Sequence, residues 1–81
     1  MNQNLIAYYI NQLTLSDATR LAKQYHIDLT QNEIKTILDF LKKNRFRVNR
    51  ENKNTLLKEA QPLFSKETYN KIVLLVDKFI K

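Results

Sequence analysis

The chain has no glycine among its 81 residues, and this absence narrows the folds that it can adopt. Glycine supplies the backbone conformations of tight hairpin turns and of the loops that cradle phosphate groups. P-loop enzymes and dinucleotide-binding folds are therefore disfavoured. Hydrophobic residues make up 43% of the sequence, which is compatible with folding, and the length fits one domain over residues 1–81.

Apolar residues recur at the three- and four-residue spacing of an α-helix along most of the chain. This spacing predicts five short helices, over about residues 3–13, 16–26, 30–44, 49–62 and 65–80. The expected core stripes are Ile6, Tyr9, Ile10, Leu13; Ala18, Leu21, Ala22, Tyr25; Ile34, Ile37, Leu38, Leu41; Leu56, Leu57, Ala60; and Tyr69, Ile72, Val73, Val76, Ile80. We expect an all-α fold, a compact bundle of about five short helices with helices 2–3 and 4–5 as helical hairpins.

Polar residues mark where several helices begin. Thr30 and Glu33 have the spacing of a capping box, in which each side chain accepts a hydrogen bond from the other's backbone N–H. Ser16 followed by Asp17 predicts the start of the second helix, and Ser65 predicts the start of the fifth. Asn49 is the expected N-cap of the fourth helix.

The connection after the third helix alternates charged and apolar residues. Arg45-Phe46-Arg47-Val48 has the period of an extended strand, so we expect Phe46 and Val48 to turn inward and the two arginines outward. Asn44, just before it, is expected to take the left-handed helix-end conformation that glycine would otherwise supply.

Positive charge is concentrated in this same region. The net charge is +6, and residues 42–53 contribute +5 of it, from six basic residues against Glu51 alone. Such a local excess points to an anionic partner. The candidate nucleic-acid-binding residues are Lys42, Lys43, Arg45, Phe46, Arg47, Arg50 and Lys53.

Two interpretations of this segment stay open. In the first, the arginines grip phosphates with their planar forks and an exposed Phe46 stacks on a base. In the second, Phe46 and Val48 are buried anchors of the loop, and the cations are solvated or complement a helix dipole. The first predicts a sequence-tolerant, salt-sensitive nucleic-acid contact.

An alternative function rests on the last helix. Its run IVLLV, residues 72–76, is apolar on more than one face, and Leu5 and Tyr8 likewise lie off the main stripe of the first helix. Such faces belong either to a central core helix or to an interface. The alternative is therefore a protein-interaction domain with an acidic protein partner, or a homodimer.

Catalysis and metal binding have little support in the sequence. There is no cysteine, the one histidine is His26 at a predicted helix end, and the eight acidic residues are scattered. A pairing of His26 with Asp28 or Glu33 is conceivable, but a helix-end imidazole is the simpler reading. We expect no enzyme activity, no cofactor and no metal site. The N-terminus lacks the features of a signal peptide and no apolar run could span a membrane, which favours the cytoplasm.

Two stretches carry a family resemblance. LAKQYHIDLTQNEIKTILDFL and LLKEAQPLFSKETYNKIVLLVDKFI contain the patterns LAKQY-x-I-x-LT and LLKE-x5-S-x-ET. Over residues 21–80 they resemble a family of small uncharacterised helical proteins from Gram-positive bacteria. The resemblance implies an all-helical fold and a cytoplasmic location, and it implies no catalytic or binding residue.

Overall fold

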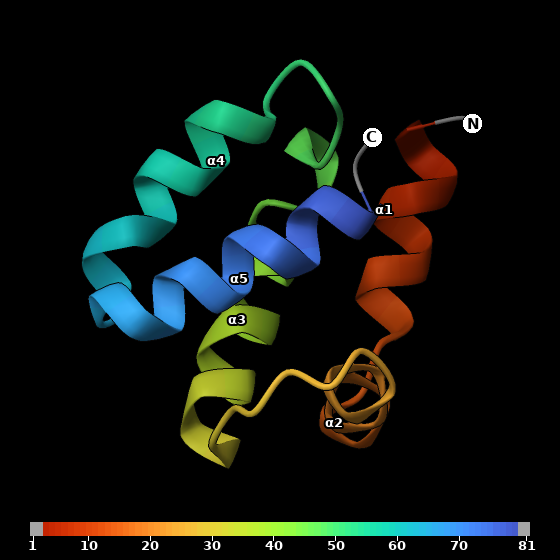
Figure 1. Ribbon diagram of the computed structural model, residues 1–81. Helices are drawn as coiled ribbons and strands as arrows, with labels where there is room; N and C mark the ends of the chain where they lie inside the picture. Colours follow the sequence, from red (N-terminus) through yellow and green to blue (C-terminus); the bar gives the residue numbers. More distant parts are fainter. Residues whose placement is uncertain (1–2, 80–81) are drawn as a thin grey trace.

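The computed structural model describes residues 3–79, with side chains from residue 5 to residue 77. This part of the chain forms five α-helices and two short 3₁₀ turns, and no strand (Figure 1). They are α1 (Gln3–Gln12), α2 (Leu15–Gln24), α3 (Gln31–Lys43), η1 (Arg45–Arg47), α4 (Lys53–Ala60), η2 (Gln61–Leu63) and α5 (Lys66–Phe79). The expected all-α bundle of about five short helices is therefore confirmed.

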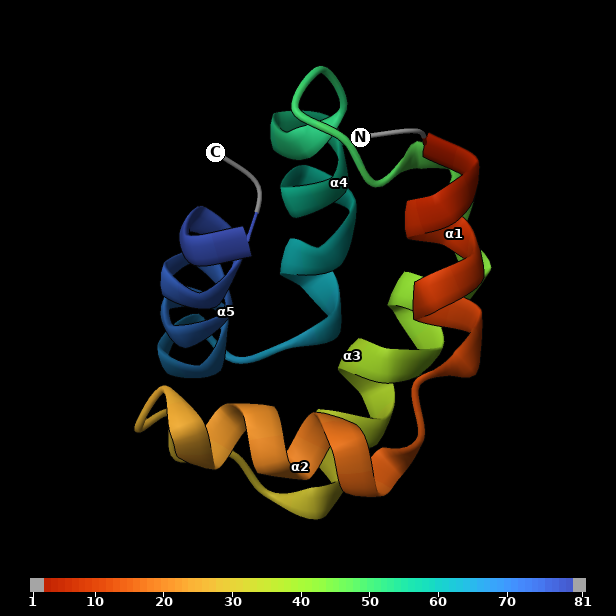
Figure 2. The same cartoon turned by 90° about the vertical axis from the view of Figure 1, so that its right-hand side faces the viewer.

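Helices α4 and α5 lie side by side (Figure 2). The chain reverses through η2, and the ammonium of Lys53 at the start of α4 lies 2.5 Å from the carboxylate of Asp77 near the end of α5. The two helices are therefore antiparallel. Helices α2 and α3 pack as a consecutive pair, and the amide of Gln31 donates to the hydroxyl of Thr19 at 3.3 Å. In Figure 1 the axis of α2 points toward the viewer, whereas the axis of α3 lies in the plane of the picture. The two helices therefore cross at a steep angle.

The core forms where α1, α3 and α4 meet the chain that follows η1. Ile10, Val48 and Leu56 are buried together, and Ile6, Phe40 and Leu41 pack against them. Removing one such aliphatic side chain from water stabilises the fold by about 1.5–3 kcal/mol.

One expected core residue of α1 is outside the core. Tyr9 is 61% exposed, whereas Ala7, which the stripe omitted, is 1% exposed. Because η1 packs against α1, a small residue suits the closely packed side and the bulky ring turns outward. Ile80, the last member of the expected α5 stripe, lies outside the described residues.

Two of the expected helix starts are confirmed. The hydroxyl of Thr30 accepts from the backbone N–H of Glu33 at 3.1 Å, and the Glu33 carboxylate accepts from the N–H of Thr30 at 2.8 Å. The hydroxyl of Ser65 accepts from the N–H of Thr68 at 3.2 Å at the start of α5. These side chains satisfy backbone donors that have no partner within the helix.

The other two expected starts were wrong. Thr14, not Ser16, caps α2, because Thr14 and Asp17 have the capping-box spacing and exchange both hydrogen bonds, at 3.0 and 3.1 Å. Helix α4 begins later than Asn49 predicted. The Asn49 side chain accepts from the N–H of Asn52 at 2.8 Å and so closes a turn that precedes the helix.

The C-terminal end of α2 is where the sequence predicted it, whereas the end of α3 differs from the prediction. Helix α2 ends beside His26, whose φ of 57° is left-handed, and the N–H of Ile27 donates back to the Ala22 carbonyl at 2.9 Å. Asn44 does not take that conformation, since its φ is −110°. Its side chain instead donates to the Phe40 carbonyl at 2.9 Å, and the chain continues directly into η1.

Candidate nucleic-acid interface

The segment predicted to be extended is the 3₁₀ turn η1. The N–H of Arg47 donates to the Asn44 carbonyl at 2.8 Å. With about three residues per turn, residues two apart do not share a face as they would in a strand. Val48 is buried at 7% exposure as expected, but Phe46 is 56% exposed, so its predicted inward orientation was wrong.

The exposed ring of Phe46 is covered on one side by its neighbour. The guanidinium carbon of Arg45 lies 4.8 Å from the centre of the Phe46 ring, within the range of a cation–π contact. One guanidinium nitrogen of Arg45 also donates to the Lys42 carbonyl at 2.8 Å. This hydrogen bond fixes the guanidinium at the end of α3 and the start of η1.

Arg47 forms a salt bridge with an acidic residue on another helix. Its guanidinium donates to both carboxylate oxygens of Glu59, at 3.0 and 2.6 Å, and to the Asn44 side-chain oxygen at 2.9 Å. The hydrogen bonds and positive charge of Arg47 hold the pKa of Glu59 below its ordinary value, and Glu59 raises the pKa of Arg47. Arg47 therefore joins η1 to α4, and its guanidinium is already paired with a carboxylate of the protein.

Lys53 also forms a salt bridge within the fold, with Asp77, and this pair joins α4 to α5. The lysine side chain is 24% exposed. Residues 42–53 alone carry +5, and counting the two acids that the fold brings to them, Glu59 and Asp77, lowers this to +3. The local excess is real but smaller than the sequence suggests.

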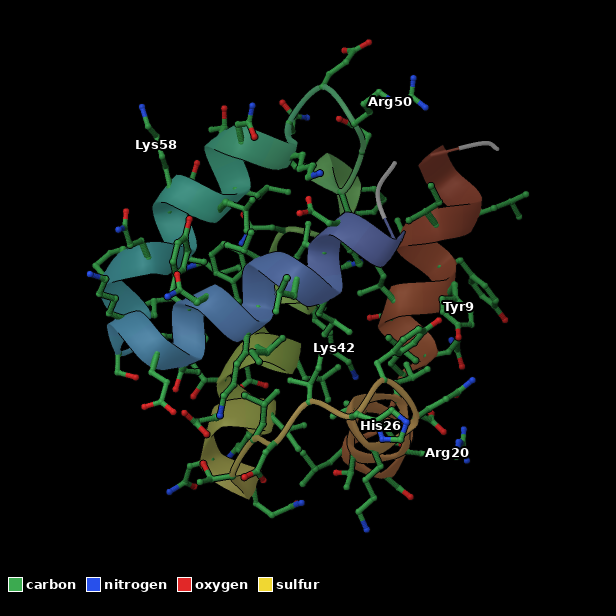
Figure 3. All side chains as sticks on the ribbon, in the orientation of Figure 1. Tyr9, Arg20, His26, Lys42, Arg50 and Lys58 are labelled. Carbon is green, nitrogen blue, oxygen red and sulfur yellow. The ribbon has the colours of Figure 1, made fainter. Side chains whose placement is uncertain are left out.

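The remaining cations do not converge on one point. Figure 3 shows Arg50 extending from the loop before α4, whereas Lys42, in the last turn of α3, lies well away from it. Lys42 is half-buried, and Lys43 and Arg50 are exposed. The exposed candidates that are sequence neighbours of the Arg45–Phe46 stack are therefore Lys43 and Arg50. We call Lys43, Arg45, Phe46 and Arg50 the η1 group.

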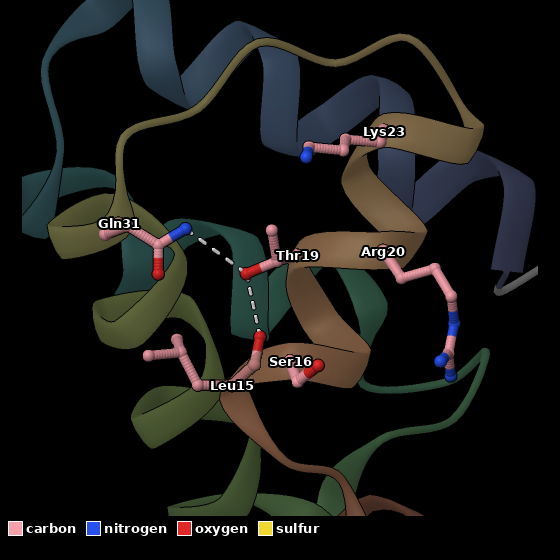
Figure 4. Close-up of a pocket in the computed structure, with 6 residues that line it drawn as sticks. All are labelled: Leu15, Ser16, Thr19, Arg20, Lys23 and Gln31. Carbon is pink, nitrogen blue, oxygen red and sulfur yellow. Dashed lines mark hydrogen bonds between the residues drawn. The ribbon is translucent and has the colours of Figure 1, made fainter.

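A second polar surface lies between α2 and the start of α3. A hollow of about 530 Å³ there is lined by Leu15, Ser16, Thr19, Arg20, Lys23 and Gln31 (Figure 4). The Thr19 hydroxyl donates to the Leu15 carbonyl at 2.8 Å and accepts from Gln31. Arg20 points away from Thr19 and pairs with Asp17 at 3.0 Å. The side chains of Thr19, Gln31 and Arg20 are therefore paired within the protein.

The carboxylate of Glu33 is also hydrogen-bonded within the protein. Besides capping α3, its carboxylate accepts a short hydrogen bond from the hydroxyl of Thr68, which is buried on α5. This bond and those to Thr30 hold the pKa of Glu33 below its ordinary value. No group of three or more His, Cys, Asp or Glu side chains that could hold a metal ion occurs among the described residues. Within the same part of the chain, each helix is too short or too polar to cross a membrane.

The sequence was compared with known protein families, curated proteins and solved structures. The sequence matches the family described as Protein of unknown function (DUF2624) over residues 1–80. The chain belongs to this family. No curated protein and no solved structure matches it. The expected membership in a small uncharacterised family is therefore confirmed.

Proposed function

We propose that this DUF2624 protein binds single-stranded nucleic acid through the η1 group. The observation that carries the proposal is the exposed Phe46 ring with the Arg45 guanidinium 4.8 Å from its centre. An aromatic ring flanked by cations is the recurring arrangement by which proteins stack on unpaired bases without reading their sequence.

Each member of the η1 group has a separate role. A base stacks on the uncovered side of Phe46 or on the guanidinium plane of Arg45, a contact worth about 1–3 kcal/mol in such sites. The hydrogen bond from Arg45 to the Lys42 carbonyl positions that guanidinium before the ligand arrives. Lys43 and Arg50, which are exposed on either side of η1 in the sequence, supply phosphate contacts.

Lys42, Arg47 and Lys53 have supporting roles in this proposal. Arg47 joins η1 to α4 through Glu59, and Lys53 joins the start of α4 to α5 through Asp77. The contacts with phosphates are counted from the three cations of the η1 group, Lys43, Arg45 and Arg50. Since each phosphate contact contributes about −0.7 to the slope of log affinity against log salt for a single strand, raising salt from about 50 to 200 mM weakens binding roughly 20-fold.

The test is the affinity for short single-stranded DNA and RNA at these two salt concentrations. Arg45→Ala and Phe46→Ala are compared with Lys58→Ala, which removes one exposed cation from α4 (Figure 3). We expect Phe46→Ala to weaken binding roughly tenfold, in line with the loss of one stacked base. Lys58→Ala should change affinity far less. No binding by the folded wild-type protein at the lower salt concentration would overturn the proposal.

The alternative, a protein-interaction domain using the C-terminal helix, has less support. Among the described side chains of α5, Leu74 is the one large apolar residue that is more than half exposed, and Asn70 and Asp77 are exposed beside it. An acidic protein partner would contact the cations of the η1 group instead, and its binding would not require the Phe46 ring. We further propose the cytoplasmic location that the sequence favours and the Gram-positive origin that the family resemblance implies.

A further inference from the structure

Asn44 lies at the junction of α3 and η1, and its half-buried side chain forms hydrogen bonds to both elements. Its side-chain nitrogen Nδ2 donates to the Phe40 carbonyl at 2.9 Å, and its backbone N–H donates to the same carbonyl at 3.1 Å. Its side-chain oxygen Oδ1 accepts from the guanidinium of Arg47 at 2.9 Å. An asparagine amide carries a donor group and an acceptor, and both are used here.

The turn that contains the Arg45–Phe46 stack is closed twice by the same two residues. The carbonyl of Asn44 accepts from the backbone N–H of Arg47 at 2.8 Å, and Oδ1 of Asn44 accepts from the Arg47 side chain. Arg45 and Phe46 are the two residues between these closed ends. The geometry of the turn therefore sets where the stack lies, and the side-chain bond restricts how far the turn can open.

The guanidinium of Arg47 is also held from its other side. The nitrogen that donates to Asn44 donates to one carboxylate oxygen of Glu59 at 3.0 Å, and the second nitrogen donates to the other oxygen at 2.6 Å. A planar guanidinium held by three hydrogen bonds has few alternative positions. Asn44 thus connects the end of α3, η1 and α4 through one continuous set of hydrogen bonds.

The backbone conformation does not explain an asparagine at this position. Asparagine is common at helix ends because it tolerates a left-handed φ, but the φ of Asn44 is −110°. Its distinguishing feature here is the amide. Aspartate would keep an acceptor for Arg47, but it would lose the donor to the Phe40 carbonyl and would place a negative charge at the C-terminal end of α3.

We infer that Asn44 is a positioning residue for the η1 group. It holds the turn in the form in which the Arg45 guanidinium lies 4.8 Å from the centre of the exposed Phe46 ring. The inference rests on the proposed function, because it gives Asn44 a role in nucleic-acid binding that acts through the stack. A stack that is already ordered loses less conformational entropy when a base binds, so the affinity is higher.

The first measurement is made on the free protein. The guanidinium lies over the Phe46 ring, so the ring current shifts the side-chain protons of Arg45 upfield in the NMR spectrum. We expect Asn44→Ala to lose most of this upfield shift. Ser65→Ala is the matched control, because it removes a polar helix-end side chain at the start of α5 and leaves η1 intact, so it should keep the shift. Circular dichroism establishes that both variants fold.

The second measurement is the affinity for a short single-stranded oligonucleotide at about 50 mM salt. Asn44→Ala should weaken binding roughly two- to tenfold, which corresponds to the cost of ordering one long side chain on binding. In an Arg47→Ala background the same substitution should change the Arg45 shift and the affinity little further, because Asn44 then has no guanidinium to position. Fully additive effects would show that Asn44 acts only on the end of α3, and would overturn the inference.

Two further results would contradict the positioning role. One is an Asn44→Ala variant that keeps the wild-type shift of Arg45. The other is a variant that loses this shift and still binds the oligonucleotide as tightly as the wild type. A wild-type protein that does not bind single-stranded nucleic acid would overturn the proposed function, whereas the Arg45 shift of the free protein would still test the positioning by Asn44.

Discussion

The guanidinium of Arg47 spans both carboxylate oxygens of Glu59, at 3.0 and 2.6 Å, and thereby joins η1 to the last turn of α4. This pair uses one cation of the basic segment to join two elements of the fold. It also orients the adjacent Arg45–Phe46 stack, because η1 is only three residues long. The pair therefore limits the charge of the candidate interface and supports its shape.

Removing the charge of Glu59 should strengthen nucleic-acid binding. In Glu59→Gln the guanidinium of Arg47 loses its ionic partner and can contact a further phosphate, so we expect a several-fold gain in affinity at low salt and a steeper salt dependence. Glu67→Gln is the matched control, since it removes the same charge from an exposed position on α5. Equal affinities for the two variants in fluorescence anisotropy would contradict the assignment of Arg47.

Acid should destabilise the protein through three carboxyl groups. The pKa of Asp17 is lowered chiefly by the backbone N–H of Thr14, that of Glu33 by the Thr68 hydroxyl, and that of Glu59 by Arg47. A carboxyl group whose pKa is lower in the folded state stabilises the fold above its unfolded pKa. Ordinary values of 3.8 for Asp and 4.5 for Glu mean that this stability is lost as pH falls below about 4.5.

The measurement is the urea midpoint of unfolding between about pH 3 and pH 7. Glu33→Gln keeps an acceptor for Thr68 but cannot titrate, so its stability should fall less steeply with acid than that of the wild type. If the urea midpoint of Glu33→Gln falls with pH as steeply as that of the wild type, Glu33 does not contribute to the loss of stability in acid.

The two capping boxes should each contribute measurably to stability. Thr14→Ala and Thr30→Ala remove an acceptor for a helix N–H, at a cost of about 1 kcal/mol each. For a domain of this size that corresponds to a Tm lower by about 4–8 °C. Thr55→Ala, at an exposed position in the first turn of α4, is the control and should shift the Tm less. A Thr14→Ala variant as stable as this control would contradict the capping role of Thr14.

Glycine at residue 26 should stabilise the protein. His26 holds a left-handed φ of 57°, which costs a residue with a side chain roughly 1–2 kcal/mol, and glycine adopts it freely. Glycine also loses more entropy on folding, so we expect His26→Gly to raise the free energy of unfolding by about 0.5–1 kcal/mol net. Chemical denaturation measures this difference, and destabilisation by His26→Gly would contradict it.

Features that depend on local spacing could be predicted from the sequence. The Thr30–Glu33 box and the Ser65 cap follow from residues three apart, and the helical stripes placed Ile10, Leu38, Leu56 and Ile72 in the core. The same spacing applied to Thr14 and Asp17 would have found the correct start of α2.

The interface could be predicted only in part. A four-residue alternation is too short to distinguish a strand from a 3₁₀ turn, and so the exposure of Phe46 was missed. The acids that pair with Arg47 and Lys53 come from other helices, and their approach depends on how α4 and α5 pack. The sequence thus located the positive segment, but only the tertiary fold separates its structural cations from the η1 group.

Binding of single-stranded nucleic acid at the η1 group can be tested residue by residue. The most direct measurement is an NMR titration of the uniformly ¹⁵N-labelled protein with a short single-stranded oligonucleotide at low salt. If the oligonucleotide binds at the η1 group, the largest shifts fall on the backbone amides of residues 43–50, on the Arg45 side chain and on the ring of Phe46. Shifts centred on α1 or on the outer face of α5, or no shifts at an oligonucleotide excess, would contradict it.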